Sequence, residues 1–485
     1  KNMVLNNNII GFTIGILLLV TGCAELFSAL IDYSAHYSNY QVFLFCSVIS
    51  LFFGGAFVTA HKSFNKDLKI KQVFLLTTMC WISISLFAAL PLYFSNLDIS
   101  FTDAFFESVS GITTTGSTVL SSLDSMSPGI LVWRSFTQWI GGIGIIAFAI
   151  LILPFLDSGG MQLFKAESSD RSEKALPRTH ILIASLIGVY AGLTIICTLT
   201  YFILGMSFFD AFNHAMTTIP TGGYSTHDAS FGYFESSALQ YAGAFFMICG
   251  SIPFVLYIRA VREKKFIFWE SEQVRSFIYI LCVIIGFTTI WLWANSGNGL
   301  SDSLRLATFN IISVITTTGY ATADYTLWGS FAVIVFLFTT YMGACTGSTT
   351  GGIKVMRLVI AIKCMNNHMK NLIYPNGVFP LKFQNRPVSA DTKLTVMSFL
   401  SLYVAANVVL TVLLCFTGLD FQAAIGGAAT AIANVGPGLD PVLGPAGNFS
   451  SIPEAAKWLL AAGMLLGRLE ILTVLVLFNP AQWKW

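Results

Sequence analysis

The sequence predicts an all-helical protein that crosses a membrane many times and builds a pore from four similar units. Three observations lead to this prediction: a very apolar composition, ten apolar stretches of membrane length, and a threonine and glycine pattern that recurs between them. Of the 485 residues, 55% are hydrophobic and 10% are charged, and the mean hydropathy is +0.72. Soluble domains carry about 25% charged residues, so this is an integral membrane protein.

Ten stretches are long enough to span a bilayer, which takes about 20 mostly apolar residues. They lie near 9–31, 41–60, 72–94, 130–154, 180–204, 238–258, 276–294, 329–346, 394–416 and 457–478. The first apolar run is too long for a signal peptide and no small-residue cleavage site follows it, so we expect it to stay in the mature protein. The nine scattered cysteines form no CxxC pair, which indicates buried apolar residues rather than a metal site.

The basic residues alternate along the chain. Most Lys and Arg residues lie in every second connection, beginning with the one after the second span, whereas the other connections hold one basic residue, Arg305, and many acids. Cytoplasmic connections are enriched in Lys and Arg. We therefore expect both chain ends in the cytoplasm and the acidic connections outside.

Each later outside connection contains a segment that is too short to cross a bilayer and that reaches a glycine. The segments are DAFFESVSGITTTGST (103–118), DAFNHAMTTIPTGGYS (210–225), DSLRLATFNIISVITTTGYA (302–321) and DFQAAIGGAATAIANVGPG (420–438). Recurrence of one pattern marks a repeated structural unit. The chain then divides into two leading helices and four units of span, re-entrant half-helix, loop and span: 1–70, 71–165, 166–270, 271–375 and 376–485.

Each short segment begins at an aspartate. The four are Asp103, Asp210, Asp302 and Asp420. An aspartate before a helix accepts hydrogen bonds from free backbone N–H groups, so we expect these residues to be helix N-caps. A negative outer vestibule that attracts cations is the alternative role.

The glycine-bearing turns predict a pore, because non-helical backbone at membrane depth must be buried in protein or line a cavity. Half-helices around one axis would point their partly negative C-terminal ends at a central cation. The turns would then offer backbone carbonyls and threonine hydroxyls, and rings of such oxygens select among alkali cations. The expected filter residues are Thr114, Thr115, Gly116, Thr218, Thr221, Gly222, Thr317, Thr318, Gly319, Asn434, Val435 and Gly436.

The stretch GACTGSTTGGIKVMR (343–357) interrupts an apolar span with weak helix formers. It lacks the GxxxxGK[ST] spacing of a phosphate-binding loop. We expect either a kink or an intramembrane loop below the filter that closes the pore. The glycines concerned are Gly343, Gly347, Gly351 and Gly352.

Arg468 lies near the middle of the last apolar stretch, where a charge is costly unless it faces a cavity or a partner. Glu470, two positions along, points to another side of a helix, so the two do not form a self-contained ion pair. We expect Arg468 to face the pore as an electrostatic barrier to cations, with a structural pair to a neighbouring helix as the alternative. Arg134 and Lys457 lie at outer helix ends and can reach the interface.

These motifs carry a family resemblance over the whole chain. Two leading spans and four units with ITTTGST, TIPTGGYS, ITTTGYA and IANVGPG turns resemble the TrkH family, the ion-conducting subunits of bacterial Trk-type potassium uptake systems, in the superfamily that includes KtrB and plant HKT transporters. The resemblance implies four pseudo-symmetric units around one pore, usually in a homodimer in the bacterial inner membrane. It also implies a cytosolic TrkA-like partner ring with nucleotide-binding RCK domains.

The resemblance also implies K⁺ as the transported ion, preferred over Na⁺ because the first filter glycine, Gly116, is present. The implied K⁺ ligands are Thr114, Thr115, Thr218, Thr317, Thr318, Asn434 and Val435. Pro220 in the second turn and the Asn434-Val435 pair in the fourth depart from the threonine pattern, so we expect looser selectivity.

No catalytic constellation accompanies the pore: the six histidines are scattered, and HExxH, Walker and nucleophile-elbow motifs are missing from the sequence. We therefore expect no enzyme activity, organic cofactor or nucleic-acid partner. A secondary carrier that couples K⁺ to H⁺ or Na⁺ stays open, and Glu470 or Glu25 would be its titratable residue. A subunit of an ATP-driven pump, like the potassium-binding chain of Kdp-type systems, also stays open.

Overall fold

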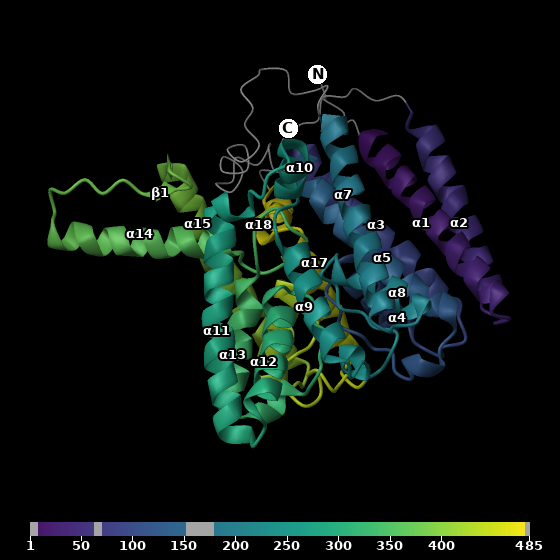
Figure 1. Ribbon diagram of the computed structural model, residues 1–485. Helices are drawn as coiled ribbons and strands as arrows, with labels where there is room; N and C mark the ends of the chain where they lie inside the picture. The colour runs from purple at the N-terminus through teal and green to yellow at the C-terminus, as the bar shows by residue number, and fades with distance from the viewer. Residues whose placement is uncertain (1–7, 63–69, 152–178, 481–485) are drawn as a thin grey trace, which may run out of the picture.

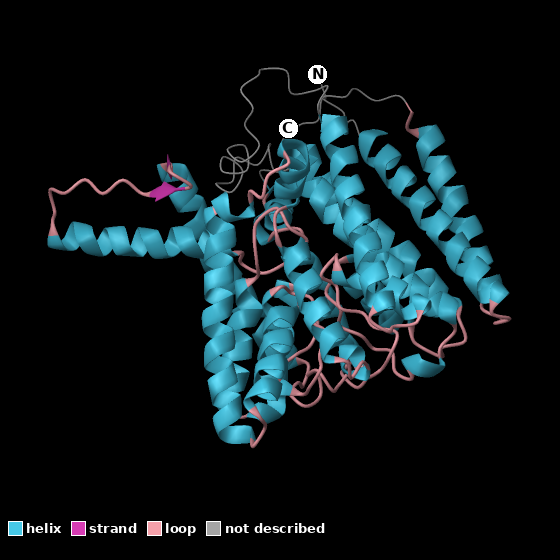
Figure 2. Ribbon diagram, in the orientation of Figure 1, coloured by secondary structure: helices cyan, strands magenta, loops and turns pink. Residues whose placement is uncertain are grey.

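The computed structural model describes residues 8–62, 70–151 and 179–480, and these residues are almost entirely helical (Figures 1 and 2). The one small sheet among them pairs β1 (Lys382–Phe383) antiparallel with β2 (Arg386–Pro387). The predicted boundary at 165/166 and both chain ends lie outside the described residues.

Long apolar helices form the body of the protein. They are α1 (Asn8–Ser34), α2 (Tyr40–Ala60), α3 (Ile70–Phe94), α5 (Pro128–Leu151), α7 (Thr179–Ile203), α11 (Glu272–Ser296) and α15 (Ala390–Phe416). Among the described residues, six helices are long and apolar enough to cross a membrane, or eight if each of two bent pairs counts as one span. The predicted span 130–154 corresponds to α5, and the predicted span 329–346 corresponds to the 13-residue α13 (Ser330–Met342). Neither helix is included in that count.

Three inner helices break inside the body. The α9–α10 pair (Ser237–Ser251, Phe254–Glu263) bends by 91°, and α17 (Glu454–Arg468) is followed at 109° by α18 (Ile471–Leu475) and η6 (Val476–Phe478). After α13, a loop at 343–354 leads to α14 (Val355–Ile373), which projects sideways in Figure 1. A proline follows the first break, and glycine at positive φ follows α13, so the sequence explains both interruptions.

Four short helices precede the predicted turns. They are α4 (Phe101–Ile112), α8 (Phe208–Thr218), α12 (Leu300–Ile315) and α16 (Phe421–Ala433). Short 3₁₀ turns follow three of these helices: η1 (Leu123–Ser125) after α4, η3 (Ser230–Tyr233) after α8 and η5 (Tyr325–Trp328) after α12. A further one, η4 (Phe268–Glu270), lies between α10 and α11.

The prediction that all four aspartates are N-caps is wrong for three of them. Ser100 and Ser207 are the caps of α4 and α8, and Asp103 and Asp210 occupy the third helical position, where each bonds the cap serine. Asp302 is likewise the third residue of α12, and only Asp420 stands at the N-cap. A carboxylate in the first turn still stabilises the positive helix end, which explains why the sequence pattern resembled a cap.

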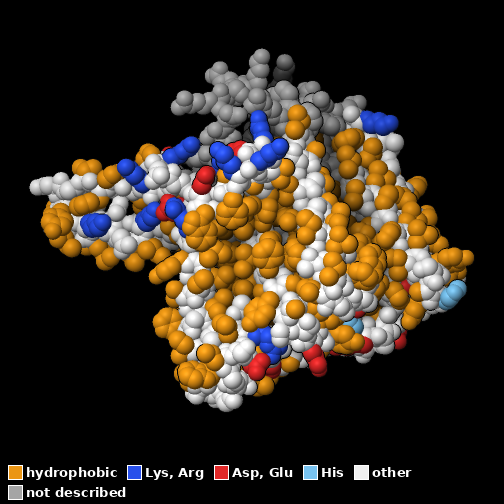
Figure 3. All heavy atoms as spheres, in the orientation of Figure 1, with side chains coloured by type: hydrophobic (Ala, Val, Ile, Leu, Met, Phe, Trp, Pro, Cys, Tyr) orange, Lys and Arg blue, Asp and Glu red, His pale blue; other side chains and the backbone are white. Residues whose placement is uncertain are grey.

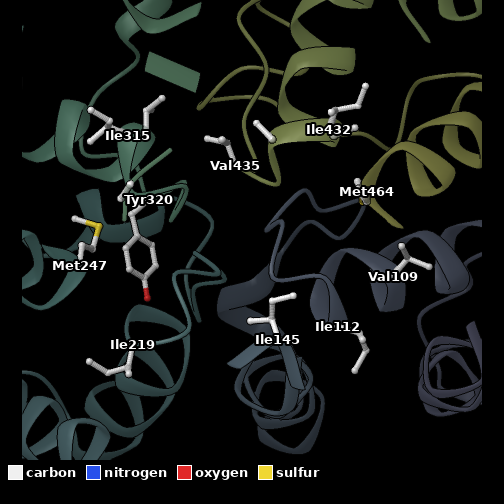
Figure 4. Packing of buried hydrophobic residues seen from close by; sticks show 14 of the residues in the cluster. Val109, Ile112, Ile145, Ile219, Met247, Ile315, Tyr320, Ile432, Val435 and Met464 are labelled. Atoms are coloured by element: carbon white, nitrogen blue, oxygen red, sulfur yellow. The ribbon is translucent and has the colours of Figure 1, made fainter. Parts of the chain in front are cut away.

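The short helices pack in a closed cycle. Each contacts the outer and inner helices of its own unit and the inner helix of the preceding unit: α4 with α3, α5 and α17; α8 with α7, α9 and α5; α12 with α11, α13 and α9; α16 with α15, α17 and α13. Figure 4 shows Ile112, Ile219, Ile315 and Ile432, from the four units, on four sides of one centre. The four units therefore surround a common axis, and the leading α1–α2 pair packs outside it on α3 and α5.

The surface matches a protein embedded in a bilayer. Hydrophobic side chains cover the middle of the face shown in Figure 3, Lys and Arg gather at its upper edge and on α14, and acidic side chains dot the lower edge. Exposed large residues such as Phe52, Ile195, Phe287 and Val412 lie on the long helices. An apolar belt between two polar rims is the pattern that lipid requires.

Two cations expected at the membrane interface are buried in ion pairs instead. Arg134 is 2% exposed, and its Nε lies 2.9 Å from Oε1 of Glu107, a buried acid in α4. Arg134 also donates to the Ser225 carbonyl. Lys457 is 4% exposed and lies 2.5 Å from Asp103. Both pairs join a half-helix to an inner helix, so they hold the cycle together.

Replacing Arg134 with methionine removes the ion-pair partner of the buried Glu107 side chain. We expect a loss of about 3–5 kcal/mol in the free energy of unfolding, measured by thermal denaturation in detergent. The exposed Arg259–Glu263 pair is the control, and Arg259→Met should cost less than about 1 kcal/mol. The Glu107→Gln/Arg134→Met double variant should be more stable than Arg134→Met alone; a less stable double variant would contradict this account.

Candidate ion pathway

The four half-helices end in the same backbone turn. One residue in each turn has left-handed backbone angles: Thr114 (φ 52°), Thr221 (57°), Thr317 (56°) and Asn434 (56°). The N–H of the next residue then bonds back to a carbonyl five residues earlier: Thr115 to Ser110, Gly222 to Thr217, Thr318 to Ser313 and Val435 to Thr430. This is a Schellman motif, built four times from different sequences.

Threonine is an unusual residue for this turn. The left-handed position of a Schellman motif is usually glycine or asparagine, because a β-branched side chain there collides with its own backbone. Such strain costs about 1–3 kcal/mol per residue and persists where the surroundings fix the conformation, often at functional sites. Three threonines hold this position here, all fully or nearly fully buried.

The turns also define which glycines are equivalent. Two residues after each left-handed position stands a glycine with positive φ: Gly116 (88°), Gly223 (80°), Gly319 (83°) and Gly436 (114°). The equivalent glycine of the second unit is therefore Gly223, one residue beyond the predicted Gly222. An isoleucine four residues before each glycine, such as Ile219 before Gly223, gives the same register in the sequence.

The four turns close into a ring through their backbones. A Cβ atom added to each ring glycine would collide with a carbonyl oxygen of the next turn: Gly116 with Gly222 at 2.2 Å, Gly223 with Thr318 at 1.8 Å, Gly319 with Val435 at 2.0 Å and Gly436 with Thr115 at 2.9 Å. Glycine is thus required both for its backbone angles and for this close approach. The contacts run from unit to unit in chain order and return from the fourth unit to the first.

Side chains brace the ring differently in each unit. Hydroxyl pairs Thr113–Thr115 (2.7 Å) and Thr316–Thr318 (2.8 Å) lie in the first and third turns. In the fourth turn, Asn434 donates to the Thr115 hydroxyl at 3.0 Å.

In the second turn, the side chain of Gln138 braces the ring by hydrogen bonds to the backbone. It donates to the Gly222 carbonyl at 2.7 Å and accepts from the Tyr224 N–H at 3.1 Å. A Cβ on Gly222 would lie 2.4 Å from the Gln138 side chain, so this glycine makes room for the brace.

Eleven of the twelve predicted filter residues lie in these four turns. The exception is Thr218, the last residue of α8, whose hydroxyl contacts the phenol oxygens of Tyr201 (3.1 Å) and Tyr320 (3.2 Å). The structure does not bring Thr218 to the ring. Gly223 is the ring residue that the sequence prediction missed.

The predicted loop lies directly against one side of the ring. The Gly351 N–H donates to the Thr317 hydroxyl (2.9 Å), and Thr349 accepts a bond from the Thr221 hydroxyl (3.1 Å). A Cβ on Gly351 would lie 2.1 Å from the carbonyl oxygen of Ala433. The loop therefore contacts the second, third and fourth turns. Gly343, Gly347 and Gly352 have positive φ and let it fold back on itself.

Arg468 is buried beside this loop and donates from Nη1 to the Thr349 carbonyl at 2.8 Å. Glu470 instead pairs with Arg357 of α14, with both carboxylate oxygens 2.7 Å from Nη2. As predicted, Arg468 and Glu470 do not form an ion pair with each other. The loop thus rests between the ring and an arginine.

The opposite side of the ring opens into a cavity whose lining includes all four ring glycines together with Arg134, His227 and Asp228. His227 bridges two carboxylates: Nδ1 lies 2.5 Å from Asp124 and Nε2 lies 3.4 Å from Asp210. Burial lowers the pKa of His227, but hydrogen bonds and charge from Asp210 and Asp124 outweigh it and raise this pKa above 6.5. Burial of Asp210 is likewise outweighed by hydrogen bonds, first from His227, so its pKa is lowered.

These features define the class of the protein: a helical membrane transport protein with four half-helices around one axis. A family model described as TrkH, cation transport protein, matches residues 39–484, so the chain belongs to the TrkH family. The Trk system potassium uptake protein TrkI of Halomonas elongata is 47% identical over 86% of this chain and 85% of its own length. TrkH of Escherichia coli is 36% identical over 90% of this chain and 91% of its own.

The fold agrees with these relatives. The crystal structure of the potassium transporter TrkH from Vibrio parahaemolyticus matches with a TM-score of 0.92 at 32% identity, over 99% of this chain and 100% of that chain. The family predicted from the sequence motifs is therefore confirmed, and it is a family of transport proteins rather than enzymes.

The distances around the ring predict unequal effects of alanine. Gly223→Ala should destabilise the protein more than Gly436→Ala, because its Cβ would lie 1.8 Å rather than 2.9 Å from the neighbouring carbonyl. We expect about 1–2 kcal/mol from backbone strain in both variants and a further 1–3 kcal/mol, roughly, from overpacking in Gly223→Ala. Thermal unfolding measures the difference.

The control for this pair is Gly286→Ala in α11, where nothing lies within 4 Å of the added Cβ, so stability should hardly change. Equal losses for Gly223→Ala and Gly436→Ala would contradict the ring contacts.

The His227 bridge predicts a pH dependence. Because the pKa of His227 is raised in the folded protein, its stabilisation is complete below the unfolded value of 6.5 and is lost as pH rises through the higher folded value. The depressed pKa of Asp210 adds stabilisation that is lost only in acid. The stability difference between wild type and His227→Asn should therefore shrink from about pH 6 to pH 9. A difference that is constant over this range would show that the bridge does not depend on a charged imidazole.

Proposed function

We propose that this protein carries potassium into the cell through the ring of four turns, by channel-like permeation of K⁺ that sheds water at backbone carbonyls. The observation that carries the proposal is the closed ring itself: four equivalent backbone turns, each at the C-terminal end of a half-helix. The partial negative charge of those helix ends favours a cation at the centre. The relatives' names, potassium uptake proteins, support K⁺ as the transported ion.

The proposed K⁺ ligands are oxygen atoms of the three consecutive ring residues in each turn. These residues are Thr114 to Gly116, Thr221 to Gly223, Thr317 to Gly319 and Asn434 to Gly436. The three ring residues of the fourth turn include no threonine. In the second turn, the Gly222 carbonyl already accepts a hydrogen bond from Gln138. Unequal ligands around the axis support a filter that prefers K⁺ but discriminates loosely.

The proposed membrane arrangement has ten spans, two leading and eight in four units of span, half-helix and span, in a bacterial inner membrane. In this arrangement α13 with its following loop and the α9–α10 and α17–α18 pairs are interrupted inner spans. The basic rim near α10 and α14 (Figure 3) supports a cytoplasmic position for that side and for both chain ends.

The proposed gate is the loop at 343–354 together with Arg468. The loop touches three of the four turns, and a buried arginine on its far side repels cations. Loop glycines at positive φ allow the loop to move without breaking a helix. Opening would require the Thr317, Thr221 and Arg468 contacts to separate.

The proposed assembly is a homodimer with a cytosolic TrkA-like ring that binds nucleotide and regulates the gate. The basic side chains of α10 and α14 offer a docking surface for such a partner. The family resemblance, together with relatives named as parts of a Trk system, supports it.

The test is rubidium uptake into potassium-loaded liposomes that contain the purified protein alone, with K⁺ or Na⁺ as competitor. We expect strong competition by K⁺ and weak competition by Na⁺, with this preference reduced about tenfold in Gly319→Ser, equivalent to about 1.4 kcal/mol. The matched control is Gly55→Ser, where nothing lies within 4 Å of the new side chain. Uptake only when a proton or sodium gradient is imposed would contradict the channel and favour a coupled carrier.

The gate is tested in the same assay with Arg468→Ala. Removing a barrier of about 1.4 kcal/mol should raise uptake about tenfold, whereas exposed Arg262→Ala should leave it unchanged. Unchanged uptake in Arg468→Ala, with the protein folded, would show that the arginine only supports the loop.

A further inference from the structure

A small cavity lies on the far side of the gate loop from the ring. Its volume is about 40 Å³, enough for a monatomic ion or a water molecule. Its lining includes loop residues 346–348 and 350–352 and four charged side chains, Lys354, Arg357, Arg468 and Glu470. Three positive groups therefore face one negative group.

Glu470, the one acid in this lining, already forms an ion pair with Arg357. Both oxygens of Glu470 lie 2.7 Å from Arg357 Nη2, and the Arg357 guanidinium stacks on the Phe399 ring at 3.8 Å. This pair is neutral as a unit. It leaves Lys354 and Arg468 as two positive charges without a carboxylate within ion-pair distance in the described part of the chain.

Arg468 also has unused hydrogen-bond donors. Its Nη1 donates to Thr349, but Nε and Nη2 are buried and have no partner among the described residues. An unsatisfied buried donor costs about 1–3 kcal/mol, and more when it is charged. At membrane depth an uncompensated cation is still more costly. Arg468, which lines the cavity, therefore carries two N–H donors that lack a partner, and Lys354 adds an ammonium group to the same lining.

We propose that this cavity binds a small inorganic anion of the chloride class, held between Arg468 and Lys354. The anion accepts hydrogen bonds from the free Arg468 nitrogens and offsets the excess positive charge. Because Arg468 belongs to α17 and Lys354 ends the gate loop, the anion links the loop to the helix. It thereby stabilises the arrangement in which the loop lies against the ring. The site does not depend on the proposed potassium transport.

Bromide tests the site directly, because it replaces chloride and scatters anomalously. Crystals of the full chain grown in bromide should show an anomalous peak between Arg468 and Lys354. A map without a peak there, with only a water molecule at this position, would overturn the proposal whatever ions the protein transports.

Thermal unfolding gives a second, independent readout. Anions that bind only the folded state raise its stability, so the unfolding temperature should rise when chloride replaces gluconate at constant ionic strength. Lys354→Met should lose this rise, and Lys265→Met, an exposed lysine at the same membrane side, should keep it. A rise that is the same in all three proteins would assign the effect to general salt action and contradict a site at Lys354.

Discussion

The close backbone approach between neighbouring turns is the constraint on which the rest of the structure depends. Each ring glycine lies against a carbonyl of the next turn, at distances that exclude any side chain. This contact fixes where the four half-helices must end and therefore how they pack between inner and outer helices. The strained threonines Thr114, Thr221 and Thr317 are buried in this packing, which fixes their left-handed backbone angles.

The electrostatics of the pathway follow from the same geometry. Four helix C-termini give the ring a partial negative charge, while Arg468 places a positive charge beyond the loop. In the proposed function, this arrangement attracts a cation to the ring and opposes it behind the loop. Pseudo-symmetry is broken where these two regions meet, because the loop follows α13 of the third unit and Arg468 ends α17 of the fourth.

Much of this architecture could be predicted from the sequence, because apolar length and recurring turns are local signals. The recurring pattern predicts the four short helices and the glycine-bearing loop, and eleven of the twelve residues proposed for the filter lie in the four turns. The register error in the second unit arose because Gly222 and Gly223 are adjacent, and residue type alone does not show which has positive φ. Counting from Ile219 would have chosen Gly223.

Other features depend on contacts that are distant in the sequence. The Lys457–Asp103 pair joins residues 354 positions apart, and the Arg357–Glu470 pair joins residues 113 positions apart. A charged residue in an apolar stretch shows that a partner is needed but not which one. For that reason the sequence predicts Arg134 and Lys457 at the interface, whereas the fold buries both.

The most direct test of the account is anomalous diffraction from crystals of the protein in rubidium. If the four turns form the ion pathway, rubidium should appear on the axis that they surround, coordinated by oxygens from all four. Rubidium bound elsewhere, with no peak inside the ring, would contradict the central claim that these four backbone turns hold the transported ion.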